Sequence, residues 1–199
     1  DEYLKEHDKK AYTASFTSWR PLYQYLSRGA DANFFEDMYN YSMKFDPDSL
    51  DKRISEQSID VIASKSQLKA LFVYFHQVDD VGHHFGFSPQ NPLYIDAIEN
   101  VDVHIGSVWR ALKLRPNYTN EDWLIIICTD HGGWDLHHSD GHDRAEVTKV
   151  FLILSGESVK RTPLGDCYQP DIAATALQHL GVYGFTSNLD GKPLGLKNL

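Results

Sequence analysis

Three uninterrupted apolar runs restrict most strongly what this chain can fold into. They occupy residues 71–75, 123–128 and 150–154. A strand with one solvated face alternates apolar and polar residues, so a continuous apolar run predicts a strand that is buried on both faces. Such strands are typical of parallel sheets covered by helices. We therefore expect strands that are parallel neighbours or near neighbours at about 69–76, 122–128 and 148–154.

The segments around these strands carry the helical pattern that such a covering requires. Apolar residues recur at helical spacing over 50–62, where Asp48 or Ser49 is expected to cap the helix. We also expect a strand at 11–17, a short helix at 21–26 and a long helix at 93–112. A further, well-capped helix is expected to begin with residues 171–177 and to end at Gly181. Over 199 residues this pattern predicts one α/β domain with a doubly wound, mostly parallel sheet and helices on both faces.

Charge and composition exclude several classes of protein. The net charge of −9 disfavours electrostatic binding to a nucleic-acid duplex or to an anionic membrane. The longest apolar run is only a few residues, so we expect no transmembrane segment in this chain. Cys128 and Cys167 allow one disulfide at most and exclude a thiolate metal site.

Most of the ten histidines follow directly after two of the apolar strands. The segment 76–86 holds Asp79, Asp80, His83 and His84, and the segment 129–143 holds a second group of Asp and His residues. In open parallel sheets, functional groups gather just past the C-terminal ends of the strands. We expect both segments to be loops in which Asp and His side chains converge on metal ions. Mixed Asp and His ligation suits zinc, and manganese or iron are alternatives.

The spacing within each segment limits how its side chains can meet. Asp79 and His83 are four residues apart, as are Asp80 and His84, and either pair can converge where Gly82 lets the chain turn. Asp130 and His131 are adjacent, so they can share a site only where the chain bends sharply at the end of a strand. Thr129 is expected to form a local hydrogen bond there rather than to act as a nucleophile.

Four motifs in the same order resemble those of the alkaline phosphatase superfamily. They are Val78-Asp79-x-x-Gly82-His83-x-x-Gly86, Val101-Asp102-x-x-Ile105-Gly106, 126–133 with its Thr-Asp-His-Gly-Gly end, and Gly141-His142. The branch that they resemble most is the type I phosphodiesterase/nucleotide pyrophosphatase group, and the resemblance runs from about residue 11 to Leu194.

The resemblance implies two divalent ions. Asp79, His83 and His142 match the ligands of one ion, and Asp130 and His131 match half of the shell of the other. The register of Gly82 favours Asp79 and His83 over Asp80 and His84. His142 is preferred over His137 and His138 because it alone follows a glycine and leads into the next strand. The second ion normally also takes an Asp and a nucleophilic Thr or Ser from earlier strands, and nothing in this chain matches them. We therefore expect residues 1–199 to be the C-terminal part of a larger catalytic domain.

The function that the resemblance implies is metal-dependent hydrolysis of phosphate esters, as in a phosphodiesterase, nucleotide pyrophosphatase or phosphatase. Its partners would be a small phosphorylated substrate and an N-terminal portion of the same protein. The alternatives are a sulfatase, a mutase or a phosphonate hydrolase of the same superfamily, or a member that binds phosphorylated ligands without catalysis. The family also favours an extracellular or secretory-pathway location.

Overall fold

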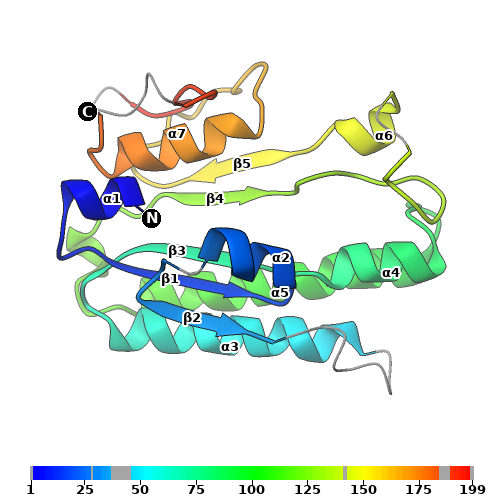
Figure 1. Cartoon of the computed structure of the whole chain (residues 1–199), viewed down its shortest axis with the longest axis horizontal. Coiled ribbons are helices and arrows are strands. Elements are labelled where there is room, and N and C mark those ends of the chain that lie inside the picture. Colours follow the sequence, from blue (N-terminus) through cyan, green and yellow to red (C-terminus); the bar gives the residue numbers. More distant parts are fainter. Residues whose placement is uncertain (1, 28, 37–45, 141–142, 184–188, 198–199) are drawn as a thin grey trace.

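The computed structural model describes residues 2–27, 29–36, 46–140, 143–183 and 189–197 (Figure 1). The strands are β1 (Tyr12–Thr17), β2 (Ala32–Phe35), β3 (Leu68–Tyr74), β4 (Ile125–Cys128) and β5 (Leu152–Ser155). The α-helices are α1 (Glu2–His7), α2 (Arg20–Leu22), α3 (Pro47–Ser64), α4 (Gln77–Phe85), α5 (Pro92–Lys113), α6 (Ala145–Thr148) and α7 (Pro170–His179). A π-helical turn, η1 (Tyr23–Ser27), and a 3₁₀ turn, η3 (Tyr118–Asn120), complete the elements of the described residues.

The strands form two hydrogen-bonded groups. β1 lies between β2 and β3, and both pairings are parallel. β4 pairs with β5, and this pairing is antiparallel. The predicted α/β class with a mostly parallel sheet is confirmed, whereas the prediction that the strands near 122–128 and 148–154 are parallel is wrong.

The connection between β4 and β5 explains the antiparallel pairing. Two parallel neighbours need a crossover connection that brings the chain back to the end of the sheet at which the first strand began, usually through a helix on the face of the sheet. The chain after Cys128 instead runs outward and comes back past α6, a helix of four residues (Figure 1). It therefore enters β5 from the far end, as a hairpin with a long loop does.

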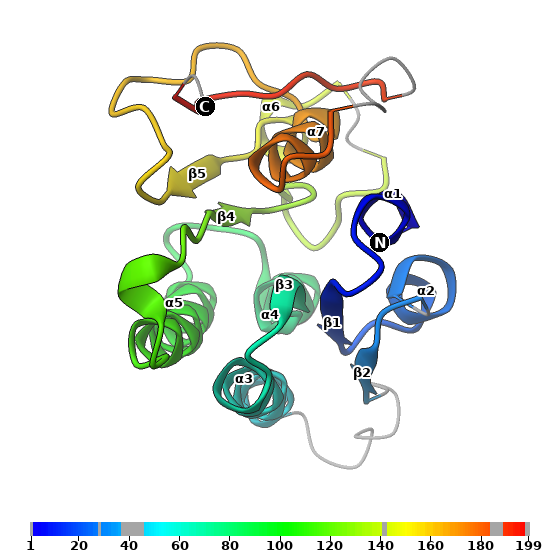
Figure 2. The ribbon, with the colours of Figure 1, turned by 90° about the vertical axis from the view of Figure 1, so that its left-hand side faces the viewer.

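Helices cover both faces of the strands, as the doubly wound prediction required. In the end-on view, α3 and α5 lie on one side of the strands, and α1, α2 and α7 lie on the other (Figure 2). The main core forms where α3 packs against α5, β1 and β3, with Phe16, Ile54, Ile62 and Leu112 among its buried residues.

Burial along the strands differs from the prediction for all three apolar runs, because Phe72, Phe151 and Ile153 are about half exposed and Cys128 is exposed. β1 is buried from Thr13 to Thr17, because strands flank it on both sides. In β3, by contrast, Phe72 keeps 47% of its surface exposed. The apolar run at 71–75 therefore belongs to a strand that the described residues cover only partly.

The N-cap of α3 shows how a polar side chain places the start of a helix. The prediction that Asp48 or Ser49 caps α3 is wrong: Asp46 is the N-cap, and its carboxylate accepts the Ser49 N–H. Pro47 then occupies the first turn, where no N–H is needed. No helix in the described part of the chain is both long and apolar enough to cross a bilayer.

Candidate metal centre

The segment after β3 forms helix α4 rather than the expected loop. Because residues four apart lie on one face of a helix, α4 places His83 directly above Asp79. Gly82 therefore serves a different purpose from the predicted turn, since it lies inside the helix.

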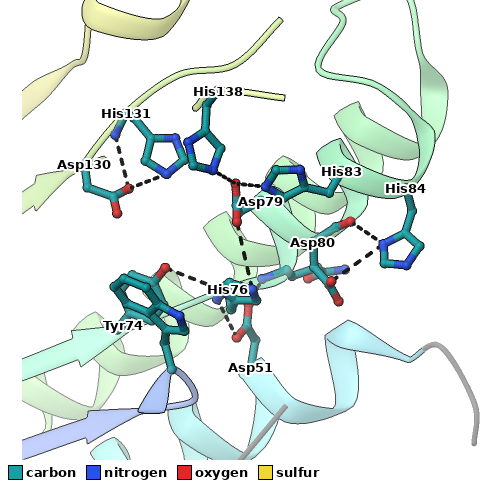
Figure 3. Close-up of polar contacts among 12 residues, drawn as sticks. Asp51, Tyr74, His76, Asp79, Asp80, His83, His84, Asp130, His131 and His138 are labelled. Atoms are coloured by element: carbon teal, nitrogen blue, oxygen red, sulfur yellow. Dashed lines mark hydrogen bonds and ion pairs between the residues drawn. The ribbon is translucent and has the colours of Figure 1, made fainter. Parts of the chain in front are cut away.

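Three side chains converge where α4 meets the loop after β4. Asp79 Oδ1 lies 3.5 Å from His83 Nε2 and 3.9 Å from His138 Nε2 (Figure 3). One ligand atom from each residue falls within 4.8 Å of the other two. We call these three residues the Asp79 cluster.

The surroundings of Asp79 Oδ1 indicate that the Asp79 cluster fits a divalent ion. Asp79 Oδ1 is buried and has no hydrogen-bond partner among the described residues. A buried carboxylate oxygen without a partner is costly, and two imidazole nitrogens facing it offer the donor set that zinc prefers. Metal bonds of about 2.0–2.2 Å place ligand atoms roughly 3–4 Å apart, which matches the spacing here.

A hydrogen bond from the opposite ring nitrogen orients the His83 imidazole for metal binding. His83 Nδ1 lies 2.8 Å from the carbonyl oxygen of Leu136. A carbonyl only accepts, so Nδ1 carries the proton and the Nε2 lone pair faces Asp79. Burial lowers the pKa of His138, with the neighbouring His131 adding to the effect. This favours the neutral imidazole that a metal ion binds.

Asp130 and His131 form a second, looser group, which we call the Asp130 pair. Their closest side-chain atoms, Asp130 Oδ1 and His131 Nε2, lie 3.8 Å apart, and the Asp130 side chain is 53% exposed. The His131 ring stacks on His138 with ring centroids 3.8 Å apart, so the pair adjoins the Asp79 cluster (Figure 3). Thr129 donates to the His131 carbonyl oxygen, as predicted for a local hydrogen bond.

The structure places the predicted site residues unevenly. It brings Asp79 and His83 together and sets the Asp130 pair beside them, while His142 lies outside the described residues. His138, which the sequence argument set aside, occupies the third position. The alternative pair also meets, but away from the cluster: His84 Nδ1 lies 3.7 Å from Asp80 Oδ1 and hydrogen-bonds the Asp80 backbone carbonyl oxygen at 2.8 Å (Figure 3). The assignment of these residues as ligands stays a prediction.

Phe87 joins the two segments of the site, and the sequence argument missed this role. Its ring lies against both Gly82 and Gly133, where a Cβ on either glycine would clash with ring carbons. The same ring meets the His83 ring edge-on at a centroid distance of 5.3 Å. Phe87 N also donates to the Asp135 carbonyl oxygen. The two glycines of the motifs are therefore needed for close packing around one aromatic ring.

Comparison with known proteins shows a family relationship. The profile of the type I phosphodiesterase / nucleotide pyrophosphatase family matches residues 3–175. The chain is 29% identical over 85 residues to GPI ethanolamine phosphate transferase 2 of Schizosaccharomyces pombe, covering 43% of this chain and 11% of that protein. It is 26% identical over 130 residues to the human GPI ethanolamine phosphate transferase 2, catalytic subunit, covering 62% of this chain and 13% of that protein. The matches thus span a small part of these curated relatives. Since the family profile covers most of its residues, the chain belongs to the type I phosphodiesterase / nucleotide pyrophosphatase family of the alkaline phosphatase superfamily.

Proposed function

We propose that this chain supplies the metal-binding part of an active site that cleaves phosphate esters. The observation that carries the proposal is the buried oxygen Asp79 Oδ1, which has no hydrogen-bond partner among the described residues and faces two imidazole nitrogens. The family match supports the class of reaction.

Each residue has a definite task in this proposal. Asp79, His83 and His138 would hold one divalent ion, most simply zinc, with His142 as the alternative third ligand. The Asp130 pair would contribute to a second ion. When bound, such ions neutralise the negative charge that a phosphoryl group develops in the transition state. Leu136 orients His83 through its carbonyl oxygen, so that the imidazole is held ready.

The nucleophile is proposed to come from outside the residues described here. The Thr129 hydroxyl donates a hydrogen bond to the His131 carbonyl oxygen. The Asp130 pair offers two ligands, whereas an open catalytic zinc site takes about three from protein. We therefore expect the 199-residue chain by itself to bind at most one ion tightly and to hydrolyse an aryl phosphodiester no faster than a His142→Ala control.

Two acceptors are consistent with this site. Water as acceptor gives hydrolysis, the activity that the resemblance implies. An alcohol as acceptor gives transfer of a phosphoester group, and the names of the two curated relatives, both ethanolamine phosphate transferases, favour this second candidate.

The decisive experiment measures metal content and reaction products together. The full-length protein, purified without chelator, is expected to contain zinc or a similar ion by elemental analysis and to cleave an ethanolamine phosphodiester. Both properties should be lost in Asp79→Ala and retained in Asp80→Asn. With an alcohol present, the ratio of transferred to hydrolysed product separates the two candidates. Metal-free protein with chelator-resistant activity would overturn the proposal.

A further inference from the structure

The start of α4 is capped by a residue from another helix. Asp51, on α3, has no exposed surface. Its Oδ1 accepts the His76 N–H and its Oδ2 accepts the Gln77 N–H, both at 2.9 Å. His76 is the N-cap position of α4, but its own side chain makes no capping hydrogen bond. Asp51 therefore satisfies, from α3, N–H groups that a helix normally caps locally.

Burying this carboxylate is costly. Burial raises its pKa to about 7, although the two N–H donors oppose that effect. Among the described residues, no Lys, Arg or His forms an ion pair with Asp51. A cap costing this much is expected where the exact placement of the helix start matters.

The anchored residues lead directly to the Asp79 cluster. His76 is buried between Tyr74 and Asp79 (Figure 3). Its Nδ1 lies 3.2 Å from the Tyr74 hydroxyl, and its Nε2 lies 3.9 Å from Asp79 Oδ2. Asp79 Oδ2 thus faces His76 while Oδ1 faces the other two imidazoles. A shift at the start of α4 would move both oxygens of Asp79. It would also move His83, which lies one turn further along the helix.

We propose that Asp51 is a positioning residue for the metal centre: by holding the His76 and Gln77 N–H groups, it sets where α4 begins and thereby the placement of Asp79 and His83. This inference rests on the proposed function, because it requires the Asp79 cluster to bind an ion. It assigns to Asp51 no contact with that ion or with a substrate.

The fold contains a matched control for this cap. Asp171, on α7, is also buried, with 3% of its surface exposed. Its two oxygens likewise accept two backbone N–H groups, those of Tyr168 at 2.9 Å and Lys192 at 2.8 Å. Asp171 forms no hydrogen bond or ion pair with Asp79, His83 or His138. The same substitution at the two positions therefore changes a buried carboxylate that accepts two backbone N–H groups, beside the Asp79 cluster in one case and outside it in the other.

The test compares Asp51→Asn with Asp171→Asn in the full-length protein. In either variant, one N–H keeps a carbonyl acceptor and the other faces an amide donor. We expect both to lower the melting temperature, but only Asp51→Asn to weaken Zn²⁺ binding, by about 10- to 100-fold in competition with a chelator. The visible absorption of bound Co²⁺ should change in Asp51→Asn and stay as in wild type in Asp171→Asn.

The outcomes separate this inference from the proposed function. If the wild-type protein binds no Zn²⁺, the proposed function fails. If it binds Zn²⁺ and Asp51→Asn binds equally well with an unchanged Co²⁺ spectrum, the cap is merely structural and the inference is wrong. Should Asp51→Asn not fold, Asp51→Ser replaces it, because a hydroxyl accepts one N–H without adding an amide donor. The same loss of affinity is expected of that variant, and unchanged affinity would overturn the inference.

Discussion

The Asp79 cluster and the Asp130 pair lie side by side but are built differently. Asp79 and His83 project from one face of a helix whose start is held by a buried carboxylate. Asp130 and His131 sit on irregular chain just past β4, and Asp130 Oδ1 accepts the N–H of the next residue. The first group has a buried oxygen without a partner, whereas the second has an exposed carboxylate with a local hydrogen bond.

This difference indicates which part of the site is organised before any ion binds. A helix restricts the Asp79–His83 distance through its own geometry. The end of a strand imposes no such restriction on two adjacent side chains. We infer that the Asp79 cluster can bind an ion from groups within this chain and that the Asp130 pair needs further ligands. The predictions below test this contrast.

The largest effect is expected from Asp79→Asn. Loss of the carboxylate should lower Zn²⁺ affinity by more than the ~100-fold that an outer hydrogen-bond partner can cost. Without metal, the variant should be at least as stable as wild type, because it removes the charge of a carboxylate whose Oδ1 is buried without a hydrogen-bond partner among the described residues. Chelator competition and thermal unfolding of the metal-free protein measure the two quantities. Asp80→Asn, which changes the neighbouring carboxylate, is the control. Equal Zn²⁺ affinity in wild type and Asp79→Asn would contradict the assignment.

The next effect decides the third ligand. Because His138 Nε2 lies 3.9 Å from Asp79 Oδ1, we expect His138→Ala to weaken Zn²⁺ binding about 100-fold. The sequence argument assigns that loss to His142→Ala instead. Zn²⁺ titration of both variants compares them directly. Unchanged Zn²⁺ affinity in His138→Ala together with a large loss in His142→Ala would identify His142 as the third ligand.

A smaller effect concerns the packing that joins the two groups. Gly82→Ala forces a Cβ into the Phe87 ring and should reduce the free energy of unfolding by about 1–3 kcal/mol. Combining it with Phe87→Leu should recover part of that loss, since the smaller side chain leaves room. Denaturant unfolding of the two single variants and the double variant gives the coupling energy. Strictly additive effects would show that the ring and the glycine do not share this contact.

The last effect is on pH dependence, where the two buried carboxylates Asp51 and Asp171 should differ in sign. Because the pKa of Asp51 is raised to about 7, its contribution to stability is full below pH 4 and is lost as the pH rises from about 4 to 7. The pKa of Asp171 is lowered by the Lys192 and Tyr168 N–H groups, so its contribution is present above pH 4 and is lost at lower pH.

Unfolding of the metal-free protein across this pH range checks both signs. Relative to wild type, Asp51→Asn should flatten the fall in stability between pH 4 and 7, and Asp171→Asn should flatten the fall below pH 4. Parallel curves for all three proteins would contradict both pKa directions.

Local patterns in the sequence determined the α/β class and the approximate strands and long helices, and they named Asp79, His83, Asp130 and His131 of the candidate site. Apolar runs and helical periodicity depend on neighbours along the chain, which is why β3, β4, α3 and α5 lie near their predicted positions. The four-residue spacing of Asp79 and His83 likewise held, although a helix rather than a loop brings the two residues together.

Only the tertiary structure decided the direction of β5, the helical state of 77–85 and the partners of Asp79. Each depends on contacts between residues far apart in the chain. The Asp51 carboxylate, 25 and 26 residues before the N–H groups that it accepts, caps α4, and Phe87 packs against a glycine from each of two segments. His138 reaches Asp79 because the loop after β4 returns toward α4. Spacing along the chain carries no information on such long-range packing, and this is the physical reason why the sequence located the site residues but not the way they are held.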